Sequence, residues 1–162
     1  MAGPHLPFIA TRPPKNMTTA TTLQIVCPHC DTTNRVQAAR LGETANCGRC
    51  KKPLFTAHPV ALGAQNFDRH TGSSGIPVLV DVWAPWCGPC RMMAPAFERA
   101  AAELEPHVRL AKVNTEAEPA IAARYGIRSI PTLALFSGGR EIARQPGAMD
   151  LSALLQWVRG NL

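Results

Sequence analysis

Trp86-Cys87-Gly88-Pro89-Cys90 lies between a segment that predicts a buried strand, Pro77 to Ala84, and one that predicts a helix, Arg91 to Leu104. The first segment is almost continuously Val and Leu in character, which is typical of a strand with both faces covered. The second carries apolar residues at helical spacing, namely Met93, Phe97, Ala100 and Leu104. Two thiols separated by two residues at a strand-to-helix junction indicate a redox-active pair.

The two thiols of this stretch are expected to have different roles. A helix that begins at Cys87 places this sulfur beside unpaired backbone N–H groups and the positive end of the helix dipole, which stabilise a thiolate. Cys87 is therefore the predicted nucleophile. Cys90 lies one turn later on the same face, pointing into the protein, and is the predicted resolving thiol. Pro89 stiffens the turn, Gly88 leaves room for a substrate chain, and Trp86 is expected to shield one side.

The residues around the dithiol resemble the thioredoxin family. The resemblance is carried by the stretch 86–90, by Val80-Asp81-Val82-Trp83-Ala84-Pro85 before it, and by Tyr125-Gly126-Ile127-Arg128-Ser129-Ile130-Pro131-Thr132 downstream. Such motifs are specific when they fall on the expected strand and helix. The resemblance implies an α/β thioredoxin fold, with a central mixed sheet flanked by helices. It also implies protein-disulfide reductase activity by thiol–disulfide exchange.

Asp81 interrupts the apolar strand that precedes the dithiol. A buried carboxylate is costly when it is charged, so its pKa should rise unless it meets a cation. By the resemblance, Asp81 takes the proton from Cys90 through water when Cys90 attacks the mixed disulfide, and Lys112 lies near the acid. The residues alone also allow an aspartate satisfied by backbone donors and a surface lysine at a strand end.

Three further positions are assigned by the resemblance. The bond between Ile130 and Pro131 is cis in the family, and Pro131 packs against the two cysteines and keeps metals away from them. The backbone edge at Ile130 pairs with an extended substrate strand. Gly147 offers a flat surface beside the site. We therefore expect Trp86, Ile130 and Gly147 to contact the substrate.

A second group of cysteines precedes this region, as Cys27-Pro28-His29-Cys30 and Cys47-Gly48-Arg49-Cys50. The C-x₂-C-x₁₆-C-x₂-C spacing predicts one structural Zn²⁺ held by four thiolates, with His29 as a turn residue rather than a ligand. Two disulfides are an alternative, which a reducing cytosol disfavours. Another is a redox centre at Cys27 and Cys30, because Cys-Pro-His-Cys resembles the DsbA family. The turn chemistry of Asp31-Thr32-Thr33-Asn34 disfavours a following helix.

Taken whole, the chain resembles the bacterial thioredoxin-2 type, which carries an N-terminal zinc ribbon. We expect a leader at 1–22, a zinc-ribbon module at 23–56 and a thioredoxin domain at 57–162. The resemblance implies a redox-active Cys87–Cys90 disulfide, recycled by NADPH-dependent thioredoxin reductase. The expected substrates are disulfide-containing cytoplasmic proteins, and the expected state is a monomer without a bound organic cofactor.

The beginning of the chain carries no obvious targeting signal. Residues 1–16 hold a short apolar patch broken by prolines, and the sequence contains no apolar run of about 18 residues, so no membrane contact is expected. A soluble cytoplasmic protein is predicted. The absence of acidic residues before Asp31 leaves a transit peptide as an alternative, and Met17 is an alternative start.

The net charge of +6 is concentrated at the beginning of the chain. Up to Thr56 the only acidic residues are Asp31 and Glu43, against the basic residues Arg12, Lys15, Arg35, Arg40, Arg49, Lys51 and Lys52. A basic module is compatible with nucleic-acid binding. Four thiolates and one Zn²⁺ would subtract two charges, and Phe55 is the only aromatic platform, so nucleic acid is not the expected partner. A redox-responsive zinc sensor with chaperone-like behaviour and an oxidising disulfide exchanger are alternative functions.

The remaining elements follow from local patterns. His5, His58, His70 and His107 have no partner spacing and are predicted to lie on the surface. We expect a short helix capped by Asn66 and followed by a polar loop, Thr71 to Gly75. The other expected elements are strands at 60–62 and 108–114, a helix at 116–125, a hairpin at 132–144 with a Gly-Gly turn, and a last helix capped by Asp150.

Overall fold

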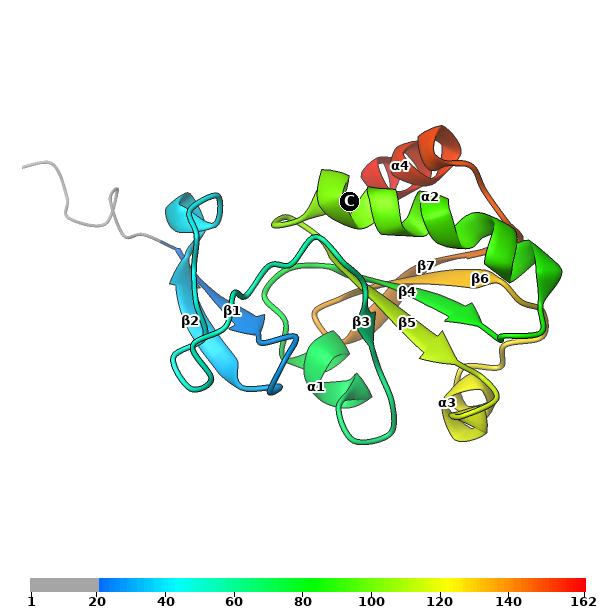
Figure 1. Cartoon of the computed structure of the whole chain (residues 1–162), viewed down its shortest axis with the longest axis horizontal. Helices are drawn as coiled ribbons and strands as arrows, with labels where there is room; N and C mark the ends of the chain where they lie inside the picture. The colour runs from blue at the N-terminus through cyan, green and yellow to red at the C-terminus, as the bar shows by residue number, and fades with distance from the viewer. Residues whose placement is uncertain (1–20) are drawn as a thin grey trace, which may run out of the picture.

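The computed structural model describes residues 21–162 (Figure 1). Residues 1–20, which include His5, Met17 and most of the expected leader, lie outside the described part. The elements in chain order are β1 (Thr22–Val26), β2 (Thr33–Gln37), the 3₁₀ helix η2 (Ala38–Arg40), β3 (Val60–Ala61), α1 (Phe67–Gly72), β4 (Val78–Trp83), α2 (Gly88–Leu104), β5 (Arg109–Asn114), α3 (Pro119–Arg124), β6 (Thr132–Ser137), β7 (Arg140–Pro146) and α4 (Leu151–Gly160).

A mixed sheet of five strands, in the order β3-β5-β4-β6-β7, forms the larger part of the molecule. β4 is its middle strand and pairs in parallel with β5 and antiparallel with β6. β3 adds to β5 in parallel, and β7 closes the hairpin with β6. The alternation of strands and helices before β6 produces the parallel pairs, because each return to the same end of the sheet needs a crossover.

Helices cover both faces of this sheet. α2 and α4 pack over one face, where Phe97 and Leu154 meet Leu79 and Leu133. α1 and α3 cover the other face, where Phe67 and Ile121 join a second cluster, and Figure 1 shows the two helix layers above and below the strands. β4 alternates its side chains between the two clusters, which explains why its sequence is apolar at nearly every position. This is the thioredoxin fold that the sequence predicts.

The cysteine-rich module is a separate small layer, built on the antiparallel pair β1-β2. Its core holds Ile25, Leu41 and Leu54 together with two cysteines, and Ile76 from the larger domain completes it. In Figure 1 the module lies at the end of the sheet where β4 and β5 begin, whereas the connection from β4 to α2 lies at the opposite end. The module and the dithiol therefore occupy opposite ends of the same strands.

The region of α1 corrects three expectations. His70, predicted to lie on the surface, is only 1% exposed. Thr71, expected in a loop, is buried in the last turn of α1 and its hydroxyl donates to the Phe67 carbonyl at 2.9 Å. Asn66 precedes α1, but its side chain does not cap the helix. It accepts instead from the N–H of its near neighbour Gly63 at 2.8 Å. It also donates to Asp31 at 3.4 Å, because this side of α1 faces the module.

The other expected elements agree closely with the structure. β1 begins one residue before the expected module, at Thr22. The expected helix at 116–125 is shorter, because residues before Pro119 form a turn. The side chain of Asp150 caps α4 by accepting from Ala153 N–H at 2.8 Å, as predicted. Within residues 21–162, no helix combines the length and the apolar character that a membrane crossing requires.

Candidate active site and metal centre

The dithiol lies where β4 ends and α2 begins. Cys87 is the N-cap of α2 and forms a disulfide with Cys90, the two Cα atoms lying 5.2 Å apart. The Cys90 N–H donates to Cys87 Sγ at 3.2 Å, so this sulfur accepts one of the otherwise unpaired donors at the start of the helix. Both cysteines are buried, at 4% and 2% exposure. What distinguishes them is the cap position of Cys87, which favours its thiolate.

The residues expected to contact substrate surround this pair. Cys87 Sγ lies 3.7 Å from the Ile130 carbonyl oxygen, and Ile130 packs against both cysteines. The Ile130–Pro131 bond is cis. Trp86 is 69% exposed beside the pair. Gly147 donates its N–H to the Pro131 carbonyl at 2.8 Å and has φ near 95°, with open space where a Cβ would stand. Trp86 and Gly147, which are exposed, and the half-buried Ile130 form a rim beside the buried disulfide.

Asp81 is fully buried within β4. Neither of its carboxylate oxygens has a hydrogen-bond partner among residues 21–162, so the alternative of backbone donors does not hold. Burial raises its pKa to about 7, and the nearby positive charge of Lys112 opposes this rise. Lys112 is the partner of Asp81 in the β4–β5 register, and its Nζ lies 4.5 Å from the centre of the Trp83 ring. Asp81 can therefore hold or release a proton near neutral pH.

The four remaining cysteines of residues 21–162 come together in the module. Each pair lies in a tight turn, here called a knuckle: residues 27–32 form the first and residues 47–52 the second. The Cys27 N–H donates to the Thr32 carbonyl and the Cys47 N–H to the Lys52 carbonyl, both at 2.8 Å. Asp31 and Lys51, which follow the second cysteine of each pair, both have positive φ, near 62° and 67°. The two knuckles are thus near copies of one turn.

The sulfurs of the knuckles meet at a spacing that suits one metal ion. All four lie within 4.8 Å of one another, and Cys27–Cys50 and Cys30–Cys47 are both 3.6 Å apart. A tetrahedron with metal–sulfur bonds of 2.3 Å has edges of about 3.8 Å, which is close to these separations. None of the four forms a disulfide, which argues against the two-disulfide alternative. The residues therefore fit a closed four-thiolate site.

The pKa values of Cys47 and Cys27 are shifted in opposite directions, by hydrogen bonds and by burial. The pKa of Cys47 is lowered to about 6, first by a backbone hydrogen bond from Cys50 and further by the Asn34 amide, which lies 3.5 Å from the sulfur. Burial instead raises the pKa of Cys27 to about 12. A metal ligand must be a thiolate, so a cation is the natural partner for the sulfur buried at Cys27. Asn34 also accepts from the Gly48 N–H at 2.9 Å and so links the two knuckles.

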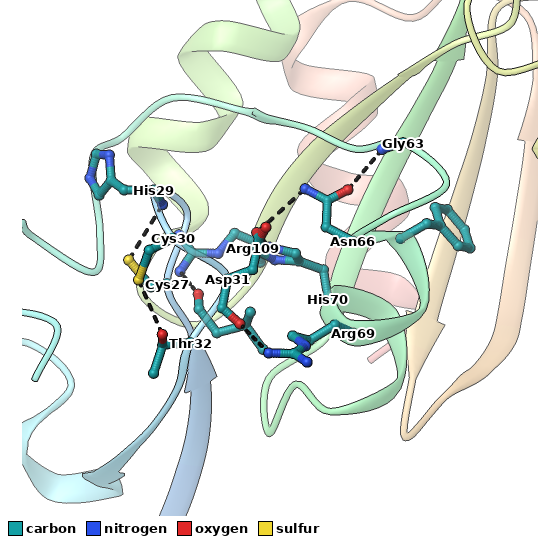
Figure 2. A network of polar contacts seen from close by, with 12 residues as sticks. Cys27, His29, Cys30, Asp31, Thr32, Gly63, Asn66, Arg69, His70 and Arg109 are labelled. Atoms are coloured by element: carbon teal, nitrogen blue, oxygen red, sulfur yellow. Dashed lines mark hydrogen bonds and ion pairs between the residues drawn. The ribbon is translucent and has the colours of Figure 1, made fainter. Parts of the chain in front are cut away.

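Several polar residues at the junction between module and sheet were not found from the sequence. Asp31 accepts from His70 Nε2 at 2.8 Å, and its carbonyl accepts from Arg69 at 3.1 Å (Figure 2). Burial lowers the pKa of His70, which keeps the ring neutral at pH 7. Arg109, at the start of β5, is also buried at this junction. The only sequence signal for it was a charged residue inside the apolar run 108–111.

The fold and the dithiol define a thiol–disulfide oxidoreductase of the α/β class. The model of the family described as "Thioredoxin" matches residues 58–160, and the model described as "Thioredoxin 2, N-terminal" matches residues 26–52. Thioredoxin C-3 of Corynebacterium nephridii is 45% identical over 138 residues, which cover 85% of this chain and 94% of that protein. Thioredoxin 1 of Synechococcus elongatus is 48% identical over 102 residues, covering 63% and 95%.

These comparisons agree with the geometry in both parts of the chain. The chain belongs to the thioredoxin family, whose members are protein-disulfide reductases. The similarity to Thioredoxin C-3 extends well beyond the length of the thioredoxin domain match, and the module has a family match of its own. The four-cysteine module is therefore part of the family resemblance and not an unrelated appendage.

Proposed function

We propose that this protein reduces disulfides in cytoplasmic proteins and is itself recycled by an NADPH-dependent thioredoxin reductase. The observation that carries the proposal is the Cys87–Cys90 disulfide, with one sulfur at the N-terminus of a long helix and a rim beside it. A sulfur at that position is activated as a thiolate, and the rim leaves room for an extended chain. The protein acts as a monomer.

The exchange takes place in two steps. The Cys87 thiolate attacks one sulfur of the substrate disulfide, a new sulfur–sulfur bond forms, and the other substrate sulfur leaves as a thiolate. Cys90 then loses its proton and attacks Cys87 Sγ, which releases the second substrate sulfur and leaves the Cys87–Cys90 disulfide. Two electrons pass from the dithiol to the substrate. Asp81 accepts the proton of Cys90, for which a pKa of about 7 is well matched.

The rim residues position the substrate for the first step. The backbone edge at Ile130 pairs with an extended substrate segment, as strand addition at an open edge does elsewhere. Trp86 offers an apolar contact to the substrate, and Gly147 offers a surface without a side chain. Gly88 leaves the approach to Cys87 free of bulk, Pro89 stiffens the turn, and Pro131 packs against the pair.

The four thiolates of the module hold one Zn²⁺ in a closed, structural site. The ion would supply the attraction that keeps four sulfurs together in a module with a small apolar core, and it would leave no open position for chemistry. Cys27, Cys30, Cys47 and Cys50 are the ligands. Metal analysis of the purified, reduced protein tests this part: one zinc per chain is expected, and its absence contradicts the site.

The reductase proposal is tested by NADPH consumption with a thioredoxin reductase and insulin as the disulfide substrate. Turnover is expected for the wild type and its complete loss for Cys87→Ser. Cys90→Ser should instead accumulate a mixed disulfide with the substrate, visible as a covalent complex on a non-reducing gel. Equal behaviour of the two variants would contradict the roles assigned, and a folded wild type without turnover would contradict the proposed function.

A further inference from the structure

Arg109 connects the two halves of the four-cysteine module from outside it. It is the first residue of β5, and it is 2% exposed. Its Nη2 donates to the Leu54 carbonyl at 2.7 Å and to the Val26 carbonyl at 3.2 Å. Figure 2 shows Arg109 reaching the first knuckle from the side of the sheet. One nitrogen of the larger domain is thus shared by two segments of the module.

The two carbonyls that accept from Arg109 lie at the bases of the two knuckles. Val26 immediately precedes Cys27 and pairs with Thr33, which closes the first knuckle. Leu54 immediately follows Pro53, whose bridge to Asn46 closes the second. A movement of either carbonyl relative to Arg109 would therefore carry a whole knuckle, with its two sulfurs, away from the other. Arg109 is therefore placed where it can set the separation of the two knuckles.

The guanidinium is itself held firmly. Its Nη1 lies 3.0 Å from Glu105 Oε1, and the side chains of the pair are 3% and 4% exposed. The other oxygen of Glu105 accepts from the Ala57 N–H at 2.9 Å, in the linker between module and domain. Phe55 adds a ring face 4.8 Å from the guanidinium carbon. A buried ion pair is costly, but here the guanidinium also donates to two backbone carbonyls, which offsets part of the cost and fixes its orientation.

The module's own side-chain links between the knuckles are of a different kind. Asn34 joins them through one amide, and His29 reaches the Pro53 carbonyl at 3.1 Å from an exposed position. Both belong to the segments that they connect, so they move with them. Arg109 belongs to the central sheet, so it can hold both segments of the module at fixed positions relative to a part of the protein outside the module. Groups that hydrogen-bond to metal ligands tune the affinity for the metal, and Arg109 lies one step further out, on the backbone that carries the two knuckles.

We propose that Arg109, oriented by Glu105, is a positioning residue for the four-thiolate centre, so that the thioredoxin domain sets the geometry of the metal site. This inference rests on the zinc site proposed above. The consequence is that the rate of metal loss depends on a residue that touches neither the metal nor its ligands' side chains. It also depends on the planar fork of arginine, which bridges two carbonyls and a carboxylate at once.

The test compares Arg109→Lys with Arg35→Lys in the full chain. Lysine keeps the charge at position 109 but lacks the fork, whereas Arg35 is exposed on β2 of the same module. The first measurement is the rate at which the reduced protein transfers Zn²⁺ to a chromogenic chelator. We expect Arg109→Lys to raise this rate severalfold, which is less than the effect of about 10- to 100-fold that follows the loss of a group bonded directly to a metal ligand. Arg35→Lys should match the wild type.

The second measurement is the absorption spectrum of the protein loaded with Co²⁺ in place of Zn²⁺. If Arg109 sets the spacing of the sulfurs, the ligand-field and thiolate-to-cobalt bands should shift in Arg109→Lys. The same bands should remain unchanged in Arg35→Lys. Faster zinc loss with an unchanged cobalt spectrum overturns the inference, because Arg109 would then act on overall stability alone. Zinc loss at the Arg35→Lys rate overturns it as well.

Glu105→Gln provides a second route to the same answer if Arg109→Lys does not fold. It keeps the size of the side chain and removes the charge that orients the guanidinium, so zinc transfer should accelerate by a smaller factor. A wild-type rate in Glu105→Gln contradicts the inference. A wild type that binds no zinc overturns the proposed zinc site itself. A wild type that binds zinc, together with an Arg109→Lys variant that loses it at the wild-type rate, overturns only the role of Arg109.

Discussion

The first knuckle, Cys27 to Cys30, and the dithiol, Cys87 to Cys90, have the same spacing and different backbones. After Cys30 the chain turns back at Asp31, whose φ is near 62° and whose N–H donates to the Cys27 carbonyl at 3.1 Å. After Cys90 the chain continues as α2 for fourteen more residues, from 91 to 104. In the knuckle the sulfurs face the other pair of cysteines. In the dithiol they face each other.

This difference shows that the residue after the second cysteine matters as much as the spacing. A residue in the left-handed region ends the turn and directs both sulfurs outward, which suits a shared metal ion. A helical residue instead keeps the first cysteine at a helix N-terminus, which suits a thiolate that reacts. The four-cysteine centre and the dithiol lie at opposite ends of the strands. The two centres can therefore coexist in one chain without forming disulfides with each other.

A Cys→Ser substitution in each centre should have the largest effects and should show whether the two centres act separately. Cys87→Ser should reduce insulin reduction to the background rate, because serine is not a nucleophile toward sulfur at neutral pH. Cys50→Ser should abolish stoichiometric zinc binding while the Cys87–Cys90 pair still forms. Turnover and metal content are measured on the same samples. Loss of zinc from Cys87→Ser would show that the two centres are not separate.

Metal removal should affect the four-cysteine module and not the thioredoxin domain. The module's core contains few large apolar residues besides its cysteines, and binding free energies of about 10–16 kcal/mol are typical of structural zinc in small modules. We expect a chelator, under reducing conditions, to unfold the module and leave the five-stranded sheet folded. Hydrogen exchange measures this directly: amides of β1 and β2 should lose protection, whereas those of β4 should keep it. Unchanged protection in β1 would contradict a metal-dependent module.

Asp81 should make the stability of the thioredoxin domain depend on pH. Its pKa is about 7 when folded, above the ordinary value of 3.8, so between these values the folded chain holds a proton that the unfolded chain has released. The free energy of unfolding should therefore fall as pH rises from about 4 to about 7, by on the order of 4 kcal/mol. Asp81→Asn should remove this dependence.

Denaturant unfolding at pH 5 and pH 8 checks this expectation. The difference between the two pH values should be large for the wild type and small for Asp81→Asn. Glu103→Gln, on the exposed side of α2, is the matched control and should behave as the wild type does. Equal pH dependence in wild type and Asp81→Asn would show that the buried carboxylate is not the group responsible. Slower release of substrate by Asp81→Asn in the mixed-disulfide assay would support its part in the second step.

The features that the sequence predicted well are those specified by nearby residues. The strand, dithiol and helix at 77–104 follow from composition and spacing within one segment, and the four-cysteine centre follows from two short motifs. His70 and Arg109 could not be placed in this way. The Asp31 partner of His70 is 39 residues away, and the carbonyls that accept from Arg109 are 55 and 83 residues away.

Polar junctions of this kind leave little trace in the sequence because each partner is ordinary in its own segment. Asp31 was assigned to a turn, correctly, but the turn also presents its carboxylate to α1. Asn66 was assigned to a helix cap, and its side chain bonds to Gly63 and Asp31 instead. The contact with Gly63 is local, whereas the contact with Asp31 exists only after the module has docked. Sequence patterns report local structure, and docking is decided by shape between segments that are distant in the chain.

The smallest expected effect concerns this junction, through Asp31→Asn. Asparagine tolerates the positive φ at this position, so the knuckle should keep its turn. The substitution replaces a charged acceptor of His70 by a neutral one, and the net loss should be about 1–2 kcal/mol in the free energy of unfolding. Asp68→Asn is the matched control, because Asp68 lies on α1, as His70 does, and pairs with Arg124 at an exposed position. Loss of that exposed pair should lower the free energy of unfolding by less than about 1 kcal/mol. If both variants lose the same small amount, the Asp31–His70 contact does not fasten the module to the sheet, and the remaining contacts, which include Arg109 and the packing of Ile76, must hold it.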